Sequence, residues 1–241
     1  MIQEMIRAVT NKYDRHARLY PALFAVLPLS LLLGLALAPA LPGASAAGSI
    51  LVASGLPLLA MGVARSKGKQ LEPKLYMRWG CKPTTTLLRF NSASNDTQVQ
   101  RWHDKLQKLV GSDLTIPSRE YELNDPTKAD EIYDTAVAAL REATRDTKKY
   151  YLAFNELCDY GLKRNLLGLK PIGLFLVGLS IVILLIAYTL APGQISPQTF
   201  LMLAFADGLL GSFWLFSVNE RWVKTAAFTY AGTLLAALER S

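Results

Sequence analysis

The chain has 241 residues, a net charge of +7 and a hydrophobic share of 51%, only slightly above that of a soluble protein. Cys81 and Cys158 are too few for a disulfide framework, and the two histidines, His16 and His103, lie too far apart in the sequence to suggest a zinc site. We find no catalytic motif, metal-ligand pattern or cofactor signature, so the sequence does not predict an enzyme.

Residues 1–20 are predicted to form an amphipathic cytoplasmic helix. Apolar residues recur at helical spacing along it, and basic residues between them would meet anionic headgroups; the two sets are Ile2, Met5, Ile6 and Val9, and Arg7, Lys12, Arg15 and Arg18. A cleaved signal peptide that ends near residues 44–46 is the competing interpretation. Against it, a signal core is shorter and a second apolar segment follows at once.

Four segments hold most of the apolar residues, namely 21–41, 46–64, 171–191 and 199–218. About 20 apolar residues suffice to cross a bilayer as a helix. The pattern therefore predicts an all-α membrane protein with four transmembrane helices in two hairpins, 21–64 and 166–218. Pro28 and Pro57 interrupt the first two segments, and we interpret them as ordinary kinks, with a gating hinge as the alternative.

The distribution of charge predicts the topology. Residues 1–20, 64–170 and 219–241 hold all 26 Lys and Arg residues, whereas the connections 39–49 and 191–198 are uncharged. Lys163, Arg164 and Lys170 directly precede the third apolar segment. Because positive charge marks the cytoplasmic flank of a span, both termini and the central block are predicted to be cytoplasmic, in a bacterial inner membrane.

The block 65–165 is predicted to be a helical cytosolic ligand-sensing domain inserted between spans two and three. Residues 70–80 continue the second span, residues 97–110 form a helix that stops at Gly111, and residues 113–124 form a loop or one short turn. A further helix begins at Asp125-Pro126 and runs to about Tyr151. His103 is expected on a solvated surface.

Two further stretches complete the chain. Residues 62–69 superficially resemble a phosphate-binding loop, but the spacing is wrong and Gln70 replaces the required hydroxyl, so we interpret them as a juxtamembrane basic linker. Residues 219–241 are predicted to form a C-terminal cytoplasmic helix. Together with the fourth span it could make a single long helix that leaves the membrane.

Two basic stretches are candidates for binding an anionic ligand. Pro83 and three threonines after it are typical of a helix start, where free backbone N–H groups can hold a phosphate. The predicted ligand-binding residues are Lys82, Thr84, Thr85, Arg89, Lys163 and Arg164. The alternatives are a capped helix with surface cations for the first stretch and plain membrane-flanking charge for the second.

Asp207 is the one ionisable residue within a predicted span. A carboxylate there is costly and normally faces protein or water. In a symmetric oligomer it would form a ring of acids that selects cations, which makes Asp207 a candidate pore residue. The alternative is a protonated acid that is hydrogen-bonded to a Ser or Thr of another span.

Three stretches together resemble a known family: WGCKPTTTLLR at 79–89, TRDTKK at 144–149 and YGLKRNLLGLKP at 160–171. They resemble small bacterial four-span proteins that look like membrane effectors of anti-phage systems, and among these the effectors of the Hailong system. The resemblance covers most of the chain. It implies a tetrameric ion channel that a single-stranded DNA oligomer, made by a partner nucleotidyltransferase, holds shut until phage infection removes it.

The sequence thus predicts a homo-oligomeric, ligand-gated ion channel whose cytosolic domain binds an anionic oligonucleotide and whose opening depolarises the membrane. A basic vestibule suits such a ligand because phosphate neutralisation dominates its binding. The alternative is a non-channel membrane scaffold that docks a partner protein through its cytosolic helices.

Overall fold

The computed structural model describes residues 11–37, 45–92 and 95–240, of which residues 37, 45–58 and 240 are described by their backbone alone. The described residues are helical or irregular, with no β-strand among them. They form two units. The first comprises the described parts of Met1–Glu72 and Gly161–Val223, and the second comprises those of Pro73–Tyr160 and Lys224–Ser241.

The first apolar segment is one continuous helix with two π-helical stretches. Asn11 caps its start by accepting a hydrogen bond from the Tyr13 N–H at 2.9 Å. The parts are α2 (Lys12–Asp14), η1 (Arg15–Leu19), α3 (Tyr20–Leu32) and η2 (Leu33–Leu37). The predicted amphipathic helix 1–20 lies outside the described residues up to position 10. From Lys12 onward it continues directly into the span.

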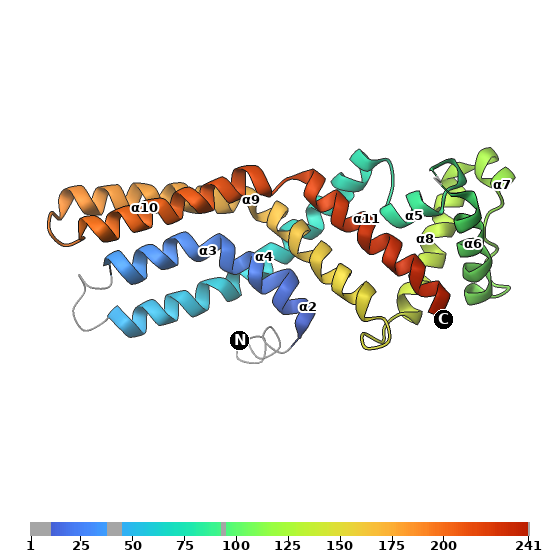
Figure 1. Ribbon diagram of the computed structural model, residues 1–241, viewed down its shortest axis with the longest axis horizontal. Helices are drawn as coiled ribbons and strands as arrows, with labels where there is room; N and C mark the ends of the chain where they lie inside the picture. The colour runs from blue at the N-terminus through green and yellow to red at the C-terminus, as the bar shows by residue number, and fades with distance from the viewer. Residues whose placement is uncertain (1–10, 38–44, 93–94, 241) are drawn as a thin grey trace. The chain divides into compact units, whose positions relative to one another are not determined.

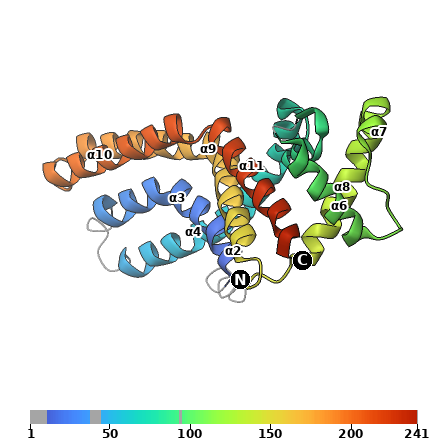
Figure 2. The same ribbon diagram turned by 45° about the vertical axis from the view of Figure 1, so that its right-hand side comes forward.

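The second hairpin of the first unit is formed by α9 (Tyr151–Leu190) and α10 (Pro197–Ser212), which ends in the π-helical η5 (Phe213–Ser217). Gly193 turns the uncharged connection with φ +89°, and Ser196 caps α10 by accepting from the Thr199 N–H. Figures 1 and 2 both show the apolar end of α9 beside α10. The stretches Lys12–Ala36, Tyr151–Leu190 and Pro197–Ser217 are each long and apolar enough to cross a membrane.

Helix α4 (Ser45–Trp79) contains the predicted second span, 46–64, and continues into residues 70–80 as expected. Most side chains of that span lie outside the described set. The structure therefore provides three candidate spans among the described residues, and the fourth stays a prediction.

Three helices of the first unit meet closely where α9 enters its apolar half. A Cβ atom on Gly168 would lie 2.8 Å from the Gly68 backbone nitrogen, so α9 and α4 touch through backbone. A Cβ atom on Gly161 would lie 2.8 Å from the Ala17 Cβ. Glycine at both positions is what allows this approach. Farther along, apolar residues of all four helices pack together, among them Ala25, Ala64, Val177 and Trp214.

The second unit is a set of short helices around one apolar core. The elements are α5 (Pro83–Leu88), η4 (Phe90–Ser92), α6 (Asp96–Val110), α7 (Arg119–Asn124), α8 (Pro126–Ala143), α11 (Glu220–Ala236) from Lys224 onward and η6 (Ala237–Arg240). Leu88, Leu106, Tyr133 and Leu234 are fully buried in this core, which brings α5, α6, α8 and α11 together. Gly111 ends α6 with φ +67°, as its position after the apolar stripe predicts.

Two predicted helix boundaries were wrong. Helix α8 starts at Pro126 behind its Asp125 cap but ends at Ala143, well before Tyr151. Thr144 bonds back to the Leu140 carbonyl, and the Asp146 carboxylate accepts from the N–H groups of Lys148 and Lys149, so side chains close the backbone into a turn.

The fourth span and the C-terminal helix are also separate. Val218 is extended (φ −83°, ψ 94°), and the Asn219 side chain accepts from the Trp222 N–H, which starts α11 as a new helix. The expected single long helix is therefore broken at this point.

Candidate functional site

The first candidate stretch forms the short helix α5, with Lys82 as its N-cap residue and Pro83 in the first turn. Both predicted cations contact α8. Lys82 Nζ lies 2.5 Å from Asp134 Oδ2, and Arg89 Nε donates to Asp130 Oδ1 at 2.7 Å while its Nη2 pairs with Asp130 Oδ2. This guanidinium–carboxylate pair is bidentate, which is the stronger geometry for such pairs.

Thr85 takes part in this contact, and Thr84 is buried beside it in the sequence. Thr85 donates from Oγ1 to Asp134 Oδ1 at 2.8 Å, and Thr84 and Thr85 are both buried. Their hydroxyls are therefore not directed at a solvent-borne ligand. With only six residues, α5 also has too short a dipole for its N-terminus to be an anion site, so any ligand here would be held by the two cations.

The acids that face α5 were not predicted as site residues. Asp130 and Asp134 are four residues apart, so they lie one above the other on the same face of α8. Their four-residue spacing is the sequence feature that could have identified them as a pair. The hydrogen bond to Asp130 raises the pKa of the Arg89 guanidinium, although burial opposes it, so Arg89 stays charged. An anion that binds here must compete with two carboxylates.

A buried carboxylate fixes the chain just after α5. Glu122 of α7 accepts from the backbone N–H groups of Phe90 and Asn91 and from the Tyr133 hydroxyl, the last at 2.9 Å. Burial is the main cause that raises the pKa of Tyr133 well above its usual range, and the hydrogen bond to Glu122 adds to it. This network locks the position of Arg89 relative to α8.

His103 is buried, with 4% of its surface exposed, so its expected place on a solvated surface was wrong. Its Nε2 lies 2.8 Å from the Leu88 carbonyl oxygen. Because a carbonyl oxygen only accepts, Nε2 carries the proton. Burial lowers the pKa of His103, although the Leu88 hydrogen bond acts in the opposite direction, so the ring is neutral near pH 7.

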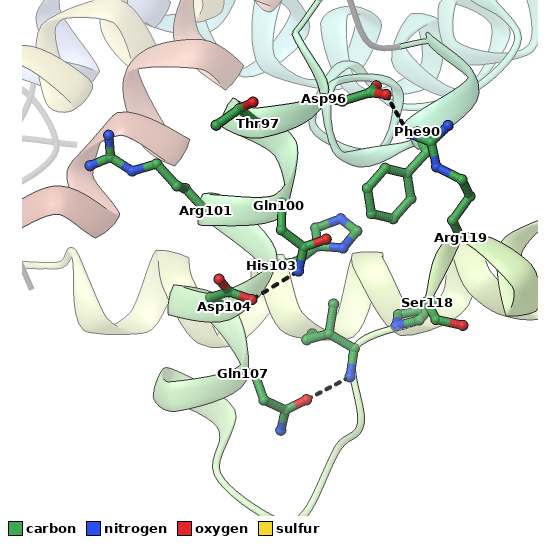
Figure 3. A pocket seen from close by; sticks show the side chains of 12 residues that line it. Phe90, Asp96, Thr97, Gln100, Arg101, His103, Asp104, Gln107, Ser118 and Arg119 are labelled. Carbon is green, nitrogen blue, oxygen red and sulfur yellow. Dashed lines mark hydrogen bonds and ion pairs between the residues drawn. The ribbon is translucent and has the colours of Figure 1, made fainter.

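Beside His103 lies a cavity of about 630 Å³ that the sequence analysis did not predict. Figure 3 shows Gln100 and Asp104 on one wall, hydrogen-bonded at 2.9 Å, and Arg119 over the Phe90 ring on the other. Its charged lining residues are Arg101, Arg119, Asp96 and Asp104. These charges balance, so the cavity has no electrostatic preference for an anion.

The second basic stretch belongs to the three-helix junction of the first unit. Arg164 is only 7% exposed; its Nη1 donates to Glu72 Oε1 at 2.9 Å, and its Nε and Nη2 donate to Asn165 Oδ1. Lys163 Nζ lies 5.2 Å from the centre of the Trp222 ring. Arg164 therefore stabilises the junction, and its burial argues against direct contact with a ligand.

Asp207 is buried in the first unit, with 3% of its surface exposed. Ser180 of α9 lies beside it, but the Ser180 hydroxyl donates to the Pro28 carbonyl at 3.4 Å, and Asp207 Oδ2 has no hydrogen-bond partner among the described residues. Burial beside a serine of another span favours the structural alternative. The role of Asp207 in a pore stays a prediction.

The predicted binding residues thus fall into two sets: Lys82, Thr84, Thr85 and Arg89 in the second unit, and Lys163 and Arg164 in the first. Comparison with protein-family models, with curated proteins and with solved structures finds no match to this chain. By its fold, the chain is a helical, multi-pass membrane protein with a second, charge-rich helical unit.

Proposed function

We propose that the chain is a homo-oligomeric, ligand-gated ion channel of the bacterial inner membrane and an effector of anti-phage defence. An anionic oligonucleotide bound to the cytosolic helices holds it closed, and its opening depolarises the membrane. The proposal includes four spans, with α4 supplying the second, and both termini in the cytoplasm.

The continuity of α9 gives the main support for the proposal. This helix is continuous over 40 residues. Its first ten residues, up to Tyr160, belong to the second unit, and the remainder belongs to the first unit. A packed helix shifts as a body, so displacement at one end can reach the other. Helix α4 likewise has residues in both units.

The ligand chemistry rests on Lys82 and Arg89, whose side chains are 45% and 27% exposed and so remain partly open to solvent. A polyanion can displace Asp134 and Asp130 because several phosphates act together and release counterions. A ligand with a single charge has no such advantage. The resemblance of residues 79–89, 144–149 and 160–171 to anti-phage effectors adds single-stranded DNA, a tetramer and a partner nucleotidyltransferase to the proposal.

A scaffold that docks a partner protein is the second candidate. It is favoured by exposed apolar side chains on α7, where Leu123 is 62% exposed. Substitution Leu123→Ser should abolish partner capture by a scaffold and leave conduction by a channel unchanged.

Purified full-length protein in a planar bilayer tests the channel directly. We expect discrete single-channel currents that a single-stranded DNA oligonucleotide suppresses, and a detergent-solubilised mass that is a multiple of 26.5 kDa. Duplex DNA of the same length is the control for non-specific polyanion effects. Membranes that remain silent at every potential, with and without oligonucleotide, would reject the proposal.

A further inference from the structure

Helix α4 carries a run of cations that have no partner among the described residues. Arg65, Lys67 and Lys69 are exposed, and their side chains form no ion pair, hydrogen bond or ring contact with any described residue. The cations of α9 differ, because Lys163 covers the Trp222 ring and Arg164 pairs with Glu72. Exposed cations beside an apolar helical segment are available to an external counter-charge.

Arg65 and Lys69 stand four residues apart, so their side chains project from the same face of α4. Leu59, Gly62 and Arg65 follow one another at three-residue intervals, so each neighbours the next on the helix surface. Leu59 is 75% exposed, and a Cβ atom on Gly62 would meet no atom within 4 Å. Gly68, three residues after Arg65, borders these residues on the side of α4 that packs on α9. One side of α4 therefore presents an apolar surface, an open backbone position and then two cations.

The spacing matches the layers of a bilayer leaflet. Arg65 and Lys69 follow Val63 by two and six residues, which places them ~3 and ~9 Å further along the helix. The headgroup region of one leaflet is about 5–8 Å thick. Lys and Arg side chains also extend their charge toward that layer while their stems contact apolar surface.

We propose that Arg65 and Lys69 form a binding site for the phosphate of an anionic phospholipid, whose acyl chains lie against Leu59 and Gly62. The inference rests on the membrane placement of α4 in the proposed topology. A soluble anion is disfavoured as the occupant because the two cations directly follow exposed apolar surface, which a soluble anion does not cover.

Native mass spectrometry of the detergent-solubilised full chain tests the site with phosphatidylglycerol and phosphatidylcholine of identical acyl chains. We expect phosphatidylglycerol to bind at least about tenfold more tightly, since each nearby cation contributes to attraction of anionic lipid. R65Q/K69Q should lose this preference. R65K/K69R, which keeps both charges, should retain it and shows that the helix tolerates substitution there.

The matched control is R141Q/K148Q, which removes two exposed cations elsewhere and should retain the preference. An equal loss in this control would overturn the site, as would equal affinity of the unsubstituted chain for the two lipids. Displacement of the lipid by millimolar inorganic phosphate would overturn the lipid assignment. Lipid binding is measured without any current, so the two proposals can fail separately. A protein that conducts ions but shows no lipid preference would reject only this site. A protein that shows the lipid preference but does not conduct would reject only the channel.

Discussion

Asn165 donates from Nδ2 to the backbone carbonyl of Ala17 across 2.5 Å, and this bond ties α9 to the first helix. Pro21, four residues after Ala17, has no backbone N–H, so the α-helical partner of that carbonyl is missing. The Asn165 Oδ1 in turn accepts from Arg164, which also reaches Glu72 on α4. One buried amide therefore links three helices.

Replacing Asn165 by Ala should destabilise the first unit. The change leaves the Ala17 carbonyl and two Arg164 donors without their partner, and each buried unsatisfied group costs about 1–3 kcal/mol. Thermal unfolding in detergent, followed by tryptophan fluorescence, should show a clearly lower midpoint. Gln70→Ala, at an exposed position of α4, is the control and should change little. Equal midpoints for the two variants would contradict the role of the junction.

Gly168→Ala and Gly178→Ala compare two glycines of α9. A Cβ atom at Gly168 would collide with the α4 backbone, which cannot rotate away, whereas one at Gly178 meets nothing within 4 Å. We expect Gly168→Ala to lower the unfolding midpoint. Gly178→Ala should be neutral, or stabilising by up to ~1 kcal/mol, because Ala favours helix over Gly. A stabilising Gly168→Ala would show that the two helices do not touch here.

Removing the acids that face α5 should strengthen binding of an anionic ligand. In D130N/D134N, Lys82 and Arg89 lose their competing partners, so affinity for a single-stranded DNA oligonucleotide should rise several-fold, and it should fall steeply with added salt. K82E/R89E should weaken binding. D113N/E120Q is the control of equal charge change, at exposed positions. Binding that follows net charge alone, with the control as strong as D130N/D134N, would remove this site.

Stability of the second unit should decrease in mild acid through His103. Burial lowers the pKa of this histidine in the folded protein below its ordinary value of 6.5, so the unfolded chain binds more protons as pH falls below that value. The contribution is thus fully present above pH 6.5 and is lost as pH falls through the folded-state pKa. His103→Gln keeps a donor for the Leu88 carbonyl but cannot titrate. Unfolding midpoints at pH 7.5 and 5.5 should differ less in His103→Gln than in the unsubstituted chain.

Asp207→Asn separates the two roles of the buried acid. Asn keeps the size and the hydrogen-bonding capacity toward Ser180, so the fold should persist. Because Asp207 is enclosed within one chain, we expect an unchanged reversal potential under a salt gradient. The comparison requires equal expression and oligomeric state. A shift toward weaker cation selectivity would instead place Asp207 on the conduction path.

The sequence by itself determined the helical class, the apolar segments and several helix ends. These features are local: Asp125-Pro126 starts α8, Gly111 ends α6 and Pro83 starts α5, because capping and periodicity act over a few residues. The same local rules failed at residues 144–149, where Thr144 and Asp146 bind the backbone and stop α8 early.

Only the tertiary structure decided what the charged side chains do. Arg89 meets Asp130 at a separation of 41 residues, and Arg164 meets Glu72 at a separation of 92. No periodic pattern encodes such pairs, because helical spacing reports which face a residue occupies and not what that face packs against. For the same reason the polar surroundings of His103 in the sequence did not reveal its burial. Burial against distant helices places Arg164 in the three-helix junction, where its ligand-binding role stays a prediction, and makes the predicted surface histidine His103 a core donor.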